Sequence, residues 1–251
     1  MSGFVALFYK EVLRFWKVLV QTVVAPVVSA LLYLVIFAQV LEAHVEVYPG
    51  VSYTRFLVPG LVMMAMLQNA FSNSSSSLIQ SKMQGNIVFV LLPPLSYLEF
   101  FLAYLGAAIL RGLVVGLGVW LATLAFVPPA LPHLGWALAF AIAACGVMGA
   151  LGIVAGIWAD KYDQLAAFQN FLILPLTFLS GVFYSLDSLP PFWQAVSRAN
   201  PVFYMIDGFR YAFLGHADAD PRLGLLVVTL GFVAISALTL AMLRSGYKLR
   251  H

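Results

Sequence analysis

Residues 112–159 read GLVVGLGVWLATLAFVPPALPHLGWALAFAIAACGVMGALGIVAGIWA, a run without a single Asp, Glu, Lys or Arg. An α-helix crosses a hydrocarbon core of roughly 30 Å with about 20 residues, so this run is too long for one membrane span. Pro128, Pro129 and Pro132 divide it, because proline breaks a helix interior. The first half extends back through Arg111 towards Glu99. The stretch therefore predicts two spans, near 100–126 and 135–158.

The rest of the chain repeats this pattern. Only 9% of the residues are charged and 63% are apolar, whereas about 25% of residues are charged in a typical soluble domain. We therefore predict an all-α polytopic membrane protein, a single transmembrane domain over residues 1–251. The six transmembrane helices are expected at about 18–41, 56–81, 100–126, 135–158, 164–185 and 223–243.

Basic side chains are distributed unequally between the two ends of the predicted spans. Cytoplasmic loops of membrane proteins carry an excess of Lys and Arg. The side that holds both termini has eight of them and the opposite side has four, so both termini are predicted to be cytoplasmic. The first group is Lys10, Arg14, Lys17, Lys82, Lys161, Arg244, Lys248 and Arg250; the second is Arg55, Arg198, Arg210 and Arg222.

Residues 1–17 form a segment too charged to cross a membrane. Lys10, Arg14 and Lys17 gather on one side of a helix, and apolar side chains cover much of the remainder. We predict an N-terminal interfacial helix that lies along the cytoplasmic leaflet. A cytoplasmic extension of the first span is the alternative.

The segment before the last span, residues 186–221, is too aromatic for a solvated loop. Stretches of 10 to 14 apolar residues that cannot span are typical of re-entrant or interfacial structure. We expect two short helices that dip into the outer leaflet. They should separate at Asn200 and Pro201, because the residue before proline resists the helical conformation.

Polar side chains interrupt two of the predicted spans. The span predicted at 56–81 carries Gln68, Asn69, Ser72, Asn73 and Ser74 to Ser77, which face either a substrate path or a tightly packed helix interface. The Gly-x-x-x-Gly pairs at 112–116 and 152–156 also predict tight helix contacts. Arg111 lies mid-span, where a guanidinium is costly. It either contacts a substrate headgroup or gate, or is a structural charge satisfied by neighbouring carbonyls or amides. The candidate path residues are Gln68, Asn69, Ser72, Asn73, Ser76 and Arg111.

Signatures of an enzyme are missing from the sequence. It contains no G-x-x-x-x-G-K-[ST] phosphate loop and no H-E-x-x-H motif. Its single cysteine, Cys145, lies mid-span. We therefore expect no catalytic, cofactor-binding or metal site, and the net charge of +3 is explained by topology and lipid contact rather than nucleic acid. A gradient-driven carrier would need a titratable mid-span group, and no span contains Asp or Glu. A third class of function is a membrane-embedded enzyme or an assembly scaffold, and the sequence shows no nucleophile–base or metal-ligand cluster for it.

Several strings of the chain resemble one family over nearly its whole length. Residues 56–64, FLVPGLVMM, and the serine-rich 71–77 look like its second span, and 92–96, LPPLS, is similar to the turn before its third. Residues 179–184, LSGVFY, followed by 200–204, NPVFY, and 208–210, GFR, look like its C-terminal signature. The chain thus resembles the permease subunits of ABC-2 type ATP-binding cassette (ABC) exporters.

The resemblance implies a half-transporter of the bacterial inner membrane. Two copies pair, as a homodimer here, and each docks a separate cytoplasmic ABC ATPase that binds the ATP. The coupling segment of the family corresponds to residues 82–98, which lack a carboxylate before Glu99. Lipids, glycans and amphipathic drugs are compatible substrates. The predicted coupling residues are Lys82, Gln84, Gly85, Asn86, Ile87 and Phe89, and the predicted outer gate is Phe183, Tyr184, Pro201, Phe203, Tyr204 and Arg210.

Overall fold

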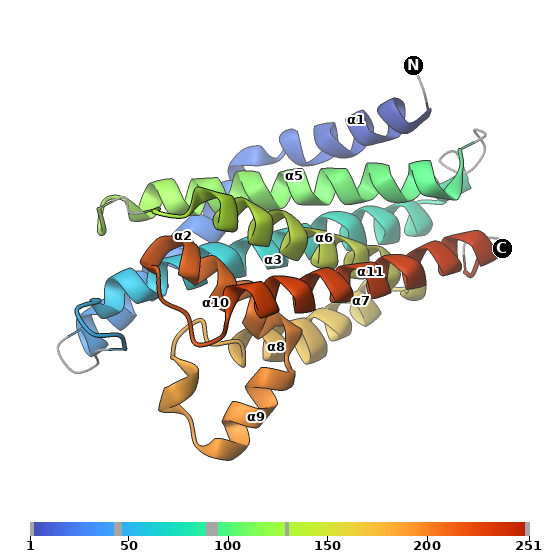
Figure 1. The fold of residues 1–251 in the computed structure, drawn as a ribbon. Helices are drawn as coiled ribbons and strands as arrows, with labels where there is room; N and C mark the ends of the chain where they lie inside the picture. Colours follow the sequence, from blue (N-terminus) through green and yellow to red (C-terminus); the bar gives the residue numbers. More distant parts are fainter. Residues whose placement is uncertain (1–2, 43–46, 89–94, 129–130, 249–251) are drawn as a thin grey trace.

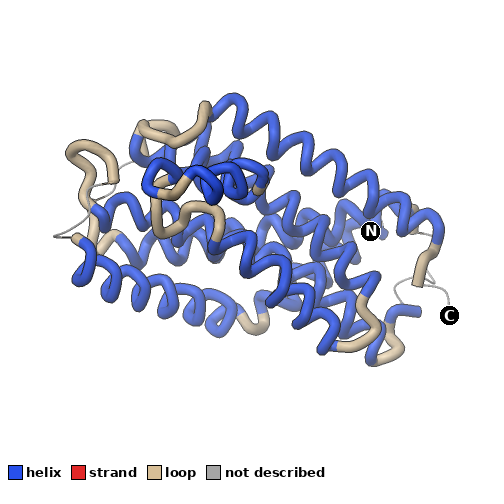
Figure 2. Tube along the Cα trace, turned by 90° about the horizontal axis from the view of Figure 1, so that it is seen from below, coloured by secondary structure: helices blue, strands red, loops and turns tan. Residues whose placement is uncertain are grey.

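The computed structural model describes residues 3–42, 47–88, 95–128 and 131–248, and these form helices and connecting loops without a strand (Figures 1 and 2). The elements are α1 (Gly3–Trp16), α2 (Leu19–Leu41), α3 (Tyr53–Met83), α5 (Tyr97–Thr123), α6 (Leu134–Trp158), α7 (Tyr162–Phe168), a π-helical turn (Gln169–Ile173), α8 (Leu174–Phe178), a 3₁₀ turn (Leu186–Ser188), α9 (Pro191–Ala199), α10 (Pro201–Leu214) and α11 (Pro221–Ser245).

Four helices of the described chain, α2, α5, α6 and α11, are long and apolar enough to cross a membrane, and each coincides with a predicted span. The predicted all-helical membrane fold is confirmed to that extent. α3 has 31 residues, roughly 46 Å at 1.5 Å per residue, but its polar side chains lower its mean hydropathy. The helical stretch from α7 to α8 is shorter than the four. The six-span count therefore stays a prediction.

The helix expected at 164–185 ends earlier than the charge pattern indicated. α8 ends at Phe178, and the chain then turns at Gly181, whose φ is +75°. Residues with a side chain rarely adopt this left-handed conformation. The run of uncharged residues continues past the end of the helix, because the absence of charge marks an apolar environment and not helical backbone.

α3 is the central helix of the bundle, packed along α5 and α6 (Figure 1). Glycines permit this close approach: a Cβ atom on Gly152 would clash with the carbonyl oxygen of Phe71, and one on Gly112 would lie 3.2 Å from that of Met66. The tight helix contacts predicted from the Gly-x-x-x-Gly pairs at 112–116 and 152–156 are confirmed.

α1 lies beside the first half of α5 and runs in nearly the same direction (Figure 1). Phe8 faces Gly106 there, and Val23 of α2 faces Gly118 further along α5. α1 and α2 therefore follow one another along the bundle. The position of α1 relative to a leaflet stays a prediction.

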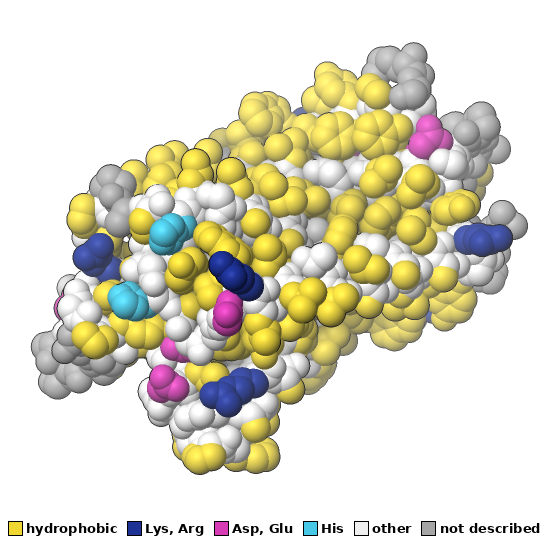
Figure 3. All heavy atoms as spheres, viewed as in Figure 1, with side chains coloured by type: hydrophobic (Ala, Val, Ile, Leu, Met, Phe, Trp, Pro, Cys, Tyr) yellow, Lys and Arg dark blue, Asp and Glu magenta, His cyan; other side chains and the backbone are white. Residues whose placement is uncertain are grey.

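Two helices form the segment before α11, as expected. α9 ends at Ala199 and α10 begins at Pro201. Asn200 lies between them; its side chain donates to the carbonyl of Leu176 at 2.6 Å and accepts from the backbone N–H of Val202 at 3.0 Å. The predicted break is confirmed, whereas the position of these helices in a leaflet remains a prediction. On the face in Figure 3, apolar side chains cover much of the surface and charged ones are few.

Candidate functional site

Five polar residues of α3 lie on one face, here called the polar stripe: Gln68, Asn69, Ser72, Asn73 and Ser76. Helix positions four residues apart lie on the same side. Gln68, Ser72 and Ser76 are half-buried, whereas Asn69 and Asn73 are buried. The other residues between Phe56 and Ile79 are buried, so Gln68, Ser72 and Ser76 form the accessible side of this central helix.

Arg111 contacts the polar stripe from α5. Its Nη2 donates to Oδ1 of Asn69 at 3.2 Å, and the amide nitrogen of Asn69 donates to the carbonyl of Ala65 at 3.0 Å. The buried Nε of Arg111 has no hydrogen-bond partner among the described residues. The guanidinium thus lies near the middle of both α3 and α5, held by one neutral amide.

Arg14 reaches the same stripe from α1. Its Nη2 donates to the backbone oxygen and to Oδ1 of Asn73, at 2.6 and 3.1 Å, and its Nη1 donates to Oγ of Ser76 at 3.3 Å. Sequence reasoning placed Arg14 only on the polar side of α1. Nothing in the spacing of α1 indicated that it would approach α3.

Glu11 is the anionic partner of this region and is fully buried. It accepts from Lys10 at 2.8 Å, from Arg14 at 3.3 Å and from the hydroxyl of Ser77 at 2.8 Å. The sequence analysis missed this role. The available signal was a carboxylate within an otherwise apolar and basic helix.

Arg210, a predicted outer-gate residue, is completely buried. Its guanidinium donates to the carbonyl of Gly181, stacks 3.9 Å from the ring centre of Phe56 and lies 3.8 Å from the carboxylate of Asp207. Asp207 also accepts the backbone N–H of Asp218 at 3.0 Å. Arg210 therefore joins α10, α3 and the turn at Gly181.

Phe183 is the gate residue that reaches α2. Its ring lies 5.5 Å from that of Tyr33 and 5.1 Å from that of Phe37, and its carbonyl accepts from Tyr53 at 2.9 Å. Such ring distances are typical of favourable aromatic contacts. Phe183 is half-buried, so it forms part of an aromatic contact between the turn and α2.

The remaining predicted gate residues differ in their burial and in their contacts. Phe203 is buried and lies against Gly181, whereas Pro201 is exposed at the start of α10. The hydroxyl of Tyr184 donates to the carbonyl of Phe178 at 3.2 Å, and that of Tyr204 donates to the carbonyl of Arg198 at 3.0 Å. The structure thus gathers Phe183, Phe203 and Arg210 around one turn and leaves the others at its edge.

Asp218, in the loop between α10 and α11, is a further residue that sequence reasoning missed. Its carboxylate accepts from Tyr48 at 2.7 Å, from the hydroxyl of Ser185 at 2.7 Å and from the backbone N–H of Leu186 at 2.6 Å. Burial raises the pKa of the Tyr48 phenol, and the Asp218 carboxylate adds to this effect. Three loops are joined at this point.

Lys82, a predicted coupling residue, turns towards the bundle. Its ammonium donates to the carbonyls of Ile157 and Ala159, at 2.9 and 2.6 Å, and to Asp160 at 3.3 Å. The three carbonyl and carboxylate acceptors belong to the end of α6 and the loop after it. Lys82 therefore fixes the end of α3 to α6.

The next coupling residues are available to a partner. Gln84, Gly85 and Asn86 are exposed in the turn after α3, and Gly85 has φ +70°. Ile87 is half-buried against the apolar side chains at this end of the bundle. Phe89 lies outside the described residues.

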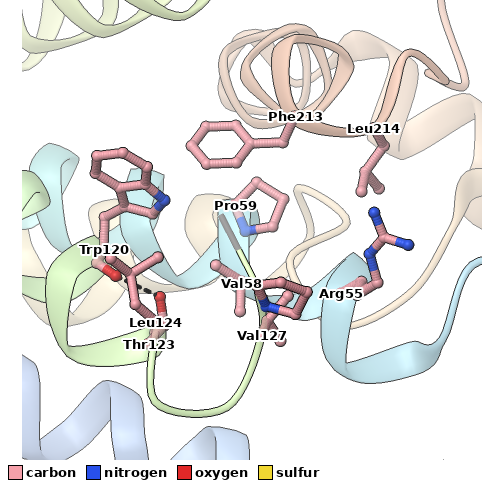
Figure 4. Close-up of a pocket in the computed structure, with 10 residues that line it drawn as sticks. Arg55, Val58, Pro59, Trp120, Thr123, Leu124, Val127, Phe213 and Leu214 are labelled. Atoms are coloured by element: carbon pink, nitrogen blue, oxygen red, sulfur yellow. Dashed lines mark hydrogen bonds between the residues drawn. The ribbon is translucent and has the colours of Figure 1, made fainter. Parts of the chain in front are cut away.

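Residues of α3, α5 and α10 line two hollows. One, of about 20 Å³, holds about one water molecule; Arg55, Pro59, Trp120 and Phe213 are among its lining residues (Figure 4). The other has a volume of about 280 Å³ and an apolar lining that includes Met66, Leu117 and Phe209. Neither hollow is lined by Arg14 or Arg111.

Among the described residues no three His, Cys, Asp or Glu side chains are grouped to hold a metal ion. Apolar helices of membrane length around a polar central helix define a multi-pass membrane transport protein. Residues 2–214 match the ABC-2 type transporter family, and the chain belongs to it. This family is a family of transport permeases without catalytic activity of their own, and its members work with an ATPase partner.

Relatives of known name agree with this assignment. The chain is 40% identical to the inner membrane transport permease YadH of Escherichia coli K12 over 227 residues, covering 90% of this chain and 86% of that protein. It is 25% identical to nodulation protein J of Rhizobium leguminosarum bv. viciae over 249 residues, 96% and 94% of the two chains. The chain is thus a multi-pass inner membrane permease.

Proposed function

We propose that this chain is the permease subunit of an ABC exporter that moves a lipid, glycan or amphipathic drug-like substrate across the bacterial inner membrane. A separate cytoplasmic subunit binds and hydrolyses the ATP, so the permease needs no cofactor of its own. The polar stripe, Arg111 and Arg14 line the substrate path, and the turn around Gly181 with Phe183 and Arg210 forms the outer gate.

One observation supports coupling most strongly: the exposed turn Gln84–Asn86 directly continues α3, the central helix that carries the polar stripe. An α-helix is a rigid rod, and packed interfaces move between discrete arrangements. A displacement of the turn by a docked ATPase therefore moves the polar stripe relative to α5 and α6. Lys82, at the same helix end, carries the motion to α6.

The proposed topology has six spans with both termini in the cytoplasm. α3 packs lengthwise against α5 and α6, so it crosses the layer that they cross. Its polar side chains are tolerated because they face protein. The helices α9 and α10 are the re-entrant segment at the outer end. Lys82 and Lys248 meet at the opposite end, as the excess of cytoplasmic basic residues requires.

Two copies are proposed to form the complete transporter. α2 and α11 are candidate spans with only 12% and 11% of their apolar windows buried within one chain. Helix faces left open in this way pack against lipid or a second copy. In a homodimer, the two polar stripes would border a shared path.

The proposal is tested by adding positive charge to the coupling turn. Gln84→Arg with Asn86→Arg places two cations at the docking surface, and we expect the ATPase to lose its stimulation by the permease in reconstituted vesicles. The matched control is Ser188→Arg, an exposed position at the outer end. Equal stimulation by both variants, or no ATPase that co-purifies with the unaltered permease in mild detergent, would refute the assignment.

A further inference from the structure

The region around the polar stripe carries more positive than negative charge. Arg14 and Arg111 both face it, and their guanidinium groups repel one another. Glu11 is already engaged by Arg14 and Lys10. Arg111 has only the neutral amide of Asn69 as a hydrogen-bond partner among the described residues. A guanidinium inside a membrane protein is stable only with an anionic or strongly accepting partner.

The chain itself offers no second anion at this depth. The predicted spans contain no Asp or Glu, and the acidic residues of the sequence lie in the N-terminal helix, at span ends, in loops or, as Asp207, in α10 beside Arg210. A second copy would bring the same set, Arg14 and Arg111 with one Glu11 that its own Arg14 and Lys10 already engage, so a dimer would add no free carboxylate. The missing partner is therefore a ligand.

Buried hydrogen-bond donors without an acceptor lie in the same region, around the polar stripe. Among the described residues, the buried Nε of Arg111 and the buried Nδ2 of Asn73 have no acceptor. Asn73 is completely buried, and leaving a buried donor unpaired costs roughly 1–3 kcal/mol. Both orphan atoms are donors, so the group that satisfies them must be an acceptor.

We propose that Arg111, Arg14 and Asn73 bind the anionic, phosphate-type headgroup of a membrane amphiphile. This inference rests on the proposed function, because it names the substrate class of that exporter. Guanidinium groups bind phosphate oxygens through parallel N–H donors. The site lies near the middle of α3 and α5, where a headgroup arrives most readily when an apolar tail offsets the cost of leaving water.

The experiment measures lipid binding to the purified permease alone in neutral detergent. Dioctanoyl phosphatidylglycerol and dioctanoyl phosphatidylcholine are titrated, and bound lipid is counted by native mass spectrometry. We expect the first to bind at least about tenfold more tightly, and Arg111→Gln to remove that preference. Arg244→Gln, which deletes an exposed cation in the last turn of α11, should leave it unchanged. Equal affinities for the two lipids, or an unchanged preference in Arg111→Gln, would overturn the proposal.

A second variant keeps the test decisive if Arg111→Gln does not fold. Asn69→Asp places a carboxylate beside Arg111 and so supplies the missing counter-charge. We expect a higher Tm together with weaker phosphatidylglycerol binding. A higher Tm with unaltered lipid binding would mean that Arg111 is purely structural and would refute the site.

Competition with inorganic phosphate distinguishes a lipid headgroup from a free phosphate ion as the anion that the site binds. Failure of millimolar phosphate to displace phosphatidylglycerol supports a headgroup that needs its tail, and full displacement would show a site for the free ion and contradict the lipid assignment. Since no ATPase is present, loss of lipid preference refutes only this inference. Loss of ATPase coupling with lipid binding intact would refute only the proposed function.

Discussion

The ammonium group of Lys82 lies 2.6 Å from the carbonyl oxygen of Ala159, so the last turn of α3 is bonded to the end of α6. Lys248, after α11, donates to the carbonyl of Trp158 at 2.9 Å and to Asp160 at 2.5 Å. Three helices that are far apart in the sequence are thus joined at one end of the bundle. This cluster lies directly before the exposed turn at 84–86.

Replacing Lys82 by Met should loosen this junction. The variant leaves two helix-end carbonyls without their charged donor, and hydrogen bonds to charged groups contribute about 1.5–3 kcal/mol each. We expect a lower Tm in detergent and weaker stimulation of the ATPase. Lys161→Met, an exposed cation in the same loop, is the control. Equal effects of the two variants would show that the charge matters and the contact does not.

Stability should also depend on the protonation of Asp160. Its hydrogen bond from Lys248, with a further one from Lys82, holds the pKa of this carboxyl below its usual value. A depressed pKa in the folded state contributes stability above the unfolded pKa of about 4, and that stability is lost as pH falls through the folded value. The Tm advantage of the unaltered protein over Asp160→Asn should therefore be constant from pH 7 to 5 and shrink below pH 4. A constant difference down to pH 3 would contradict this account.

Arg14 should hold α1 to the bundle. Arg14→Met leaves the fully buried Glu11 with Lys10 as its only cation among the described residues, and removing one partner of a buried pair costs about 3–5 kcal/mol. We expect a large fall in Tm, partly restored by adding Glu11→Gln, because the orphan charge is then removed. Lys17→Met, an exposed position, should have little effect. No rescue in the double variant would argue against the ion pair.

Gly152 should tolerate no side chain. A Cβ there would clash with the carbonyl oxygen of Phe71, a backbone atom that cannot move aside. We expect Gly152→Val to lose the monodisperse peak in size-exclusion chromatography. Gly135→Val, at a position in the same helix with open space around it, should elute as the unaltered protein does. A well-folded Gly152→Val would show that α3 and α6 can separate.

The contact between Phe183 and Phe37 should open during transport if the outer gate is assigned correctly. Cysteines at both positions, joined by a short bis-maleimide, are expected to abolish substrate transport while the ATPase still co-purifies. Each single cysteine treated with the same reagent is the control. Full transport by the cross-linked protein would place the moving gate elsewhere.

The sequence was sufficient for the membrane class and for the positions of most helices. Spans were readable because hydrocarbon excludes charge, and the run at 112–159 needed only its prolines to be divided correctly. The break at Asn200 and the close contact at Gly152 followed from local chemistry. The end of α8 did not, since Phe178 and Gly181 lie in one uncharged run.

The site required the tertiary structure. Sequence reasoning selected Asn69, Asn73 and Arg111 by their polarity in an apolar run, but gave no indication that Arg14 would lie against Asn73 or that Glu11 would be buried beside Ser77. The composition of one segment determines whether it enters the membrane. Which charges meet there depends on how separate helices pack, and that is decided by the shapes of all of them together.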